Sequence, residues 1–141
     1  MEVKFYHNAP DRLYAACSIT AKAVRQGRRI VVFTQDSALA HQYDRLLWTA
    51  SPLSFVPHVS ASSPLASCTP VVIAQTLNNL PYDDLLINLA EELPAGYDSF
   101  KLLVEIVGQD ENGRLAARNR WRFYKENSHS VQAYDLAKMQ S

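Results

Sequence analysis

Over the first fifty residues the apolar positions follow a strand pattern in some segments and a helical spacing in others. Val3 to His7 alternates as a strand does, and the continuous apolar run from Ile30 to Phe33 is typical of a strand buried on both faces. Between them, apolar residues recur at helical spacing from Arg12 to Gln26, and Gly27 suits the left-handed position that ends a helix. This strand-helix-strand order predicts a right-handed βαβ unit.

A second helix is predicted after this run, capped by Asp36 or Ser37. Its inner stripe is formed by Leu39, Tyr43, Leu46 and Leu47. Further short buried strands are expected at 71–74, 85–89 and 102–107, with one helical turn at 97–100. The sequence thus predicts an α/β fold: a single domain with a mostly parallel sheet flanked by helices, Rossmann-like but without a nucleotide site.

Residues 46–58 combine bulky apolar side chains with two prolines. Proline is excluded from helix interiors and central strands, so we interpret the segment as connecting chain. Its large groups, Trp48, Leu53 and Phe55, either cover the core from outside or contact a partner. Composition alone leaves both readings open.

A last helix is predicted from about Asp110 to Glu126, with its charges placed to suit the helix dipole. Four of its basic side chains fall within an arc of about 80°, and an aromatic side chain projects from the edge of this arc. They are Arg114, Arg118, Arg122 and Lys125, with Trp121 at the edge. The opposite side, with Leu115, Ala116 and Phe123, is expected to pack on the sheet.

Two segments carry little pattern. Residues 60–69 are rich in Ser and Ala and are predicted to form a mobile surface loop. Residues 127–141 are polar and are predicted to form a loosely held tail of the single domain 1–141.

Composition excludes several functions. The 141 residues have a formal net charge of zero, no apolar run approaches a membrane span, and the chain opens on a strand pattern without a signal peptide. We therefore expect a cytoplasmic protein without a membrane contact. Cys17 and Cys68 lack metal-ligand spacing and are expected to be reduced.

Catalytic and cofactor motifs are missing from the sequence. The loop after the first strand has no glycine, and neither a Rossmann fingerprint nor a P-loop occurs. The four histidines are far apart, and no nucleophile lies in a recognisable catalytic motif. We expect no enzyme activity, no cofactor and no metal, although a degenerate nucleotide enzyme stays a formal alternative.

The basic helix face admits four interpretations: a solvated surface, a site for nucleic-acid phosphate, a membrane surface, or a site for an acidic peptide. Net neutrality disfavours a general phosphate binder, because the acidic remainder of the chain would repel it. Arginines beside an apolar residue suit an acidic peptide with a hydrophobic end.

Two sequence features together resemble a known family. Leu47-Trp48 followed by Ser54-Phe55-Val56-Pro57-His58, the strand-helix-strand start and the Arg/aromatic last helix resemble the chi subunit of bacterial DNA polymerase III. The resemblance extends over nearly the whole chain. It implies a non-enzymatic α/β subunit of the clamp-loader complex that pairs with the psi subunit and binds the acidic C-terminal tail of single-stranded-DNA-binding protein.

The resemblance also implies two sets of site residues. Trp48 and Phe55 match the psi-facing anchors of the family. The tail-binding set is matched by Val107, Arg114, Arg118, Trp121 and Arg122, with Arg114 where a lysine is typical and Trp121 where a tyrosine is typical. The implied role is an adaptor whose association with single-stranded DNA is indirect. The rival interpretation is a protein that binds nucleic acid directly through the same helix.

Overall fold

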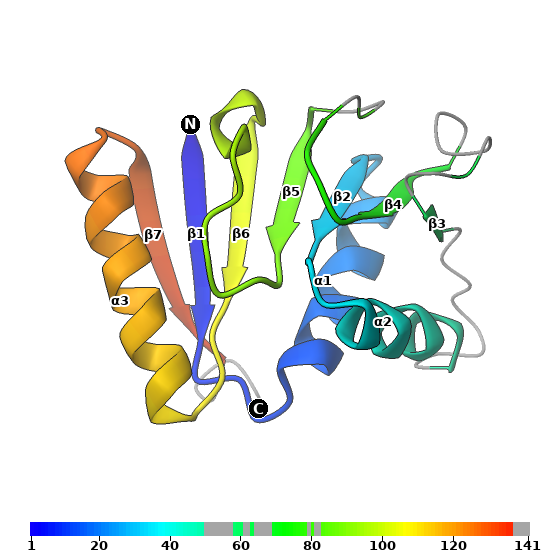
Figure 1. The fold of residues 1–141 in the computed structure, drawn as a ribbon, viewed down its shortest axis with the longest axis horizontal. Coiled ribbons are helices and arrows are strands. Elements are labelled where there is room, and N and C mark those ends of the chain that lie inside the picture. The colour runs from blue at the N-terminus through cyan, green and yellow to red at the C-terminus, as the bar shows by residue number, and fades with distance from the viewer. Residues whose placement is uncertain (50–57, 61–62, 64–68, 79, 81–82, 137–141) are drawn as a thin grey trace.

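The strands form one parallel sheet (Figure 1). The computed structural model describes residues 1–49, 58–60, 63, 69–78, 80 and 83–136. In this part of the chain seven strands lie in the order β3-β4-β2-β5-β6-β1-β7, and every neighbouring pair is parallel. The strands are β1 (Glu2–His7), β2 (Ile30–Phe33), β3 (His58–Ser60), β4 (Val71–Ala74), β5 (Leu85–Asn88), β6 (Leu102–Ile106) and β7 (Ser130–Asp135). The predicted α/β fold is confirmed.

The first βαβ unit forms as its pattern predicts. Helix α1 (Arg12–Arg25) begins where the Asp11 side chain accepts a hydrogen bond from the Tyr14 backbone N–H. It ends before Gly27, which has a φ of 81° and so takes the left-handed conformation that glycine tolerates. Strand β2 follows with all four residues buried, as its apolar run requires.

Helix α2 (Ser37–Thr49) is longer than the sequence suggested. Asp36 caps it by accepting from the backbone N–H groups of Ala38 and Leu39. Tyr43 and Leu47 are buried, as expected for its inner stripe. The interpretation of 46–58 as connecting chain is wrong for its first residues, since the backbone of Trp48 lies in the last turn of α2.

The helices cover the two faces of the sheet unequally. Helices α1 and α2 lie on one face over the central strands, and α3 (Glu111–Glu126) lies on the other face beside β1 and β7 (Figure 1). Over β2 and β5 that second face is covered by the connectors that carry Leu77, Leu80 and Leu93. The β5–β6 connector contains the expected single turn, a 3-10 helix at Tyr97–Ser99. No helix in the described ranges is long and apolar enough to span a membrane.

The sequence assigned the wrong inner face to α3. Its buried residues are Ala117, Arg120 and Tyr124, whereas Leu115 and Phe123, expected on the sheet, are 60% and 40% exposed. A hydrophobic pattern counts every arginine as polar, so it places an arginine on the outer face even where the side chain is buried against the sheet. Arg120, which is not part of the predicted basic arc, is the buried arginine.

The prediction of a loosely held tail is wrong for 130–135, because these residues form the edge strand β7. Val131 pairs with Val3 and Tyr134 with Tyr6 along β1, and the Tyr134 and Tyr6 rings stack at 5.2 Å. The edge position leaves most side chains of β7 partly or fully exposed, so the segment lacks the apolar run of a central strand. Residues 137–141, like most of the predicted loop 60–69, lie outside the described residues.

A buried ion pair fastens α3 to the sheet. Glu105 on β6 is 0% exposed, and its carboxylate accepts hydrogen bonds from Arg120 Nε at 2.9 Å and from the Tyr124 hydroxyl at 2.6 Å. The Asn88 side-chain amide lies 3.3 Å from both carboxylate oxygens, and a second Arg120 nitrogen donates to the Glu91 carbonyl. Each buried polar group in the cluster therefore has a partner.

Burial shapes the ionisation of this cluster. Burial raises the pKa of the Glu105 carboxyl, and the charge of Arg120 and the donors around the carboxylate act in the opposite direction. Burial and the adjacent carboxylate raise the pKa of the Tyr124 hydroxyl, so it stays protonated and donates. The cluster holds the third and fourth turns of α3 at a fixed depth.

Arg120→Ala is expected to lower the free energy of unfolding by about 3–5 kcal/mol, because it leaves a buried carboxylate without its cation. Chemical denaturation followed by circular dichroism measures the change. The matched control is Arg122→Ala on the exposed side of the same helix, expected within about 0.5 kcal/mol of the parent. Equal losses in the two variants would contradict the anchoring role of Arg120.

A second ion pair joins the amino ends of β2 and β5 and predicts a pH dependence. Asp84 accepts from Arg28 Nη2 at 2.8 Å, and this contact lowers the pKa of the Asp84 carboxyl. A lowered folded-state pKa contributes stability above the unfolded-state pKa, and this contribution is lost as pH falls through the folded value. Asp84→Asn should therefore melt below the parent at neutral pH, with the gap closing below about pH 4. A gap that widens in acid would contradict this assignment.

Candidate functional site: a basic groove beside helix α3

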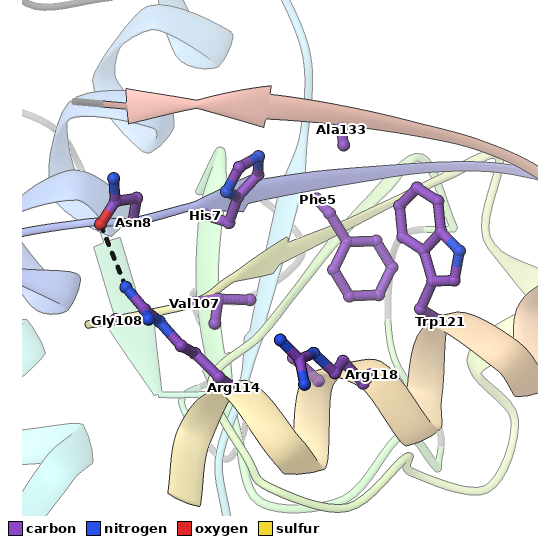
Figure 2. Close-up of a pocket in the computed structure, with 10 residues that line it drawn as sticks. Phe5, His7, Asn8, Val107, Gly108, Arg114, Arg118, Trp121 and Ala133 are labelled. Carbon is purple, nitrogen blue, oxygen red and sulfur yellow. Dashed lines mark hydrogen bonds between the residues drawn. The ribbon is translucent and has the colours of Figure 1, made fainter. Parts of the chain in front are cut away.

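A pocket of about 450 Å³ lies between α3 and the strands β1, β6 and β7 (Figure 2). It opens where β1 and β6 end, at the carboxyl edge of the parallel sheet, where open α/β sheets commonly hold their ligands. We call it the basic groove. Its lining residues are Phe5, His7, Asn8, Val107, Gly108, Arg114, Ala117, Arg118, Trp121 and Ala133.

The floor of the basic groove is apolar. Val107 follows β6 and is 6% exposed, and Phe5 on β1 is 3% exposed. The Trp121 ring meets Phe5 edge-on at 5.1 Å, and the Lys125 ammonium lies 5.0 Å from the centre of the Trp121 ring. Trp121 is thus held between an aromatic neighbour and a cation, which fixes an apolar wall.

The rim of the groove is positively charged. Arg114 and Arg118 are both exposed on α3, one helical turn apart. Arg114 Nη2 lies 3.5 Å from the Asn8 side-chain oxygen, drawn as the dashed line in Figure 2. Arg118 makes no hydrogen bond or ion pair with the described residues, and Figure 2 shows its side chain between those of Arg114 and Trp121. Two guanidinium groups therefore stand over an apolar floor.

Backbone pairing explains why these residues meet. The Val107 N–H donates to the Tyr6 carbonyl at 2.8 Å, and the Ala9 N–H donates to the Val107 carbonyl at 3.0 Å, so the chain leaving β1 is tied to the chain leaving β6. Asn8 then turns with a φ of 62°, a conformation that asparagine adopts more readily than most residues. On the chain leaving β6, three residues after Val107, Asp110 caps α3 by accepting a hydrogen bond from the Gly113 N–H.

The predicted tail-binding residues fall into two groups in the structure. Four of them, Val107, Arg114, Arg118 and Trp121, line the basic groove together. Arg122 is exposed on α3 but does not line this groove.

The predicted psi-facing residues lie largely beyond what the structure describes. The Trp48 backbone belongs to α2, and its side chain is outside the described part of the chain. Phe55 lies wholly outside the described residues.

Sequence reasoning missed the opposite wall of the groove, formed by Phe5, His7 and Asn8 of the first strand and its turn and by Ala133 of β7. The position of His7 and Asn8 after a parallel strand was an available signal, because the carboxyl ends of adjacent strands meet at one edge. Ala133 offered no such signal while its segment was interpreted as a tail.

The chemistry available in the groove is recognition of an anion with an apolar part. The lining contains no serine, cysteine or carboxylate, and within the described residues no three His, Cys, Asp or Glu side chains gather as metal ligands. Two arginines can bind a carboxylate through charge-assisted hydrogen bonds, while the floor accepts a hydrophobic side chain.

Comparison with known proteins gives one consistent family. The family model described as "DNA polymerase III chi subunit, HolC" matches residues 1–132. DNA polymerase III subunit chi of Pseudomonas aeruginosa is 31% identical over 128 residues, which cover 91% of this chain and 89% of the relative. The subunit chi of Haemophilus influenzae is 32% identical over 108 residues (76% of this chain and 75% of the relative).

The subunit chi of Escherichia coli is 29% identical over 110 residues, which cover 77% of this chain and 75% of that protein. The family match spans the sheet through Gln132 and includes all of α3, so the fold and the helix that forms the basic groove both lie within it. The chain belongs to the DNA polymerase III chi subunit family, a family of replication accessory subunits.

Proposed function

We propose that the protein is a non-catalytic adaptor of the clamp-loader complex, with no cofactor of its own. In this role it binds the psi subunit on one side and the acidic C-terminal tail of single-stranded-DNA-binding protein on the other. The observation that carries the proposal is the basic groove, where Val107, Arg114, Arg118 and Trp121 converge from two elements. Its association with single-stranded DNA is then indirect, and membership of a replication family supports a cytoplasmic location.

The groove suits a peptide terminus better than an extended phosphate backbone. A chain end carries a carboxylate beside its last side chain, and here two guanidinium groups border an apolar floor. Arg118 is the best placed to take the terminal carboxylate, because it stands between Arg114 and Trp121 and has no intramolecular partner among the described residues. Arg122 and Lys125, outside the lining, would face the acidic residues upstream.

The psi-binding part of the proposal rests on the resemblance and on the family assignment. Trp48 and Phe55 are its residues. Helix α2 ends at Thr49, so Trp48 stands at the start of the Pro-rich segment that carries Phe55. The proposed psi-binding residues therefore stand at and after the C-terminal end of α2, apart in sequence from the residues that line the basic groove.

The Arg118→Ala variant is expected to weaken binding of an acidic tail peptide by about 2 kcal/mol, the range for losing a charge-assisted contact. Titration calorimetry measures the change. Arg25→Ala is the matched control, since Arg25 is equally exposed on α1 and remote from the groove. Arg120→Ala is unsuitable as a control because that side chain is buried against Glu105. Equal effects of the Arg118 and Arg25 substitutions would contradict a specific tail-binding site at Arg118.

The rival function, direct nucleic-acid binding, is tested in the same format. A bare labelled oligonucleotide is expected to bind far more weakly than the tail peptide, because the net charge is zero and the acidic residues of the chain offset its basic face. If the oligonucleotide binds as tightly, and Arg118→Ala weakens both ligands alike, direct binding is the better description.

Truncation of the psi-facing aromatics is expected to separate the two contacts. Trp48→Ala and Phe55→Ala should each weaken psi binding by about 2 kcal/mol or more, as central interface aromatics do, and leave the tail affinity unchanged. A pull-down with purified psi and a parallel peptide titration measure both. If the variants lose thermal stability together with both contacts, the residues cover the core, and if psi binding persists in a folded double variant the assignment is wrong.

A further inference from the structure

Helix α3 borders a second groove on its other flank. About 550 Å³ of space lies between α3 and the connector that follows β5. Among the described residues it is lined by Glu91, Leu93, Pro94, Ala95, Gly96, Tyr97, Ala116, Asn119, Arg120 and Phe123. We call it the acidic groove because the carboxylate of Glu91 stands on its rim.

A large apolar side chain is exposed in this groove. Phe123 is 40% exposed and meets the Tyr97 ring edge-on at 6.0 Å. At about 100° per residue, Ala116, Asn119 and Phe123 point roughly 120° to 180° away from the Arg114–Arg118 side. The two grooves therefore open on different sides of the helix, and one ligand side chain cannot occupy both.

The charge of this groove is negative although an arginine lines it. The Arg120 guanidinium donates to the buried Glu105 carboxylate at 2.9 Å and to the Glu91 carbonyl, so its charge and donors are already engaged. The Glu91 side chain is exposed on the rim and makes no ion pair with the described residues. Glu92 and Asp98 follow on the same connector, which has no Lys or Arg between Glu91 and Phe100.

We propose that the acidic groove is a docking site for a short segment of a partner protein in which a large apolar side chain stands next to Lys or Arg. The apolar side chain packs against Phe123, Tyr97 and Leu93, and the cation pairs with Glu91. Carboxylates on the rim repel nucleic-acid phosphate and an acidic tail, so the ligand differs in charge from the one proposed for the basic groove. The adaptor thus has docking sites of opposite charge on the two flanks of one helix.

The test is an NMR titration of the ¹⁵N-labelled full chain with the amidated peptide acetyl-Lys-Leu-Phe-Arg. Saturable shifts are expected at the amides of Leu93 and of residues 95–97 and 116–123. Phe123→Ser should raise the Kd about tenfold or more, as loss of a central aromatic contact does. Glu91→Gln should raise it about threefold at low salt, because one rim ion pair is lost. Asn119→Lys, which adds a cation at an exposed lining position, provides a second test should Phe123→Ser melt early, because it should raise the Kd of the basic peptide.

Matched controls separate this site from the basic groove. Glu2→Gln makes the same charge change away from the lining and should leave the Kd of the basic peptide unchanged. Glu91→Gln should leave binding of the acidic tail peptide unchanged, so the inference can fail while the proposed function stands.

Four results would overturn the inference. They are the absence of saturable shifts at millimolar peptide, shifts confined to the basic groove, an equal Kd for the charge-reversed peptide acetyl-Glu-Leu-Phe-Glu, and shifts that grow with protein concentration alone. The last result would make a second copy of the chain the occupant.

Discussion

The ion pair between Glu105 and Arg120 is the interaction on which the arrangement of α3 depends. A carboxylate with no exposed surface requires a cation and further donors, and Arg120, Tyr124 and Asn88 supply them. Because Arg120 and Tyr124 are one turn apart on α3, satisfying Glu105 sets both the rotation and the depth of the helix on the sheet. The side chains on the flanks of α3 take their directions from that constraint.

The two flanks of α3 differ in charge because Arg120 is buried and paired, whereas Arg114 and Arg118 are exposed. Arg114 and Arg118 remain at the surface on the side of β1, where Phe5 and Val107 form an apolar floor. On the other side Arg120 is engaged by Glu105, which leaves the Glu91 carboxylate to set the charge of the rim. One helix thus borders two grooves that differ in charge.

Patterning predicted the part of the fold in which pattern and burial agree. The fully buried β2 follows from its apolar run, and α1 follows from its Asp11 cap and Gly27. Pattern failed where side-chain type and environment disagree. Arg120 is charged but buried, and Phe123 is aromatic but 40% exposed, so the inner face of α3 was assigned wrongly. Strand β7 was missed because an edge strand needs few apolar residues.

The candidate site was predictable in part for a related reason. Arg114, Arg118 and Trp121 share one helix, so helical spacing alone brings them together, and the family resemblance added Val107. Arg122 lies on the same exposed side but outside the lining, because the helix turns it away from β1. Phe5 and Ala133 reach the groove through strand pairing between distant segments, which no local pattern encodes.

The most direct test of the account compares two forms of one acidic tail peptide, with a free and with an amidated C-terminus, by titration calorimetry. If the basic groove reads a chain end through Arg118, amidation should raise the Kd about tenfold or more, the equivalent of a lost charge-assisted hydrogen bond. If the two peptides bind equally, the groove responds to the overall negative charge of the peptide, and the account of a terminal-carboxylate site is contradicted.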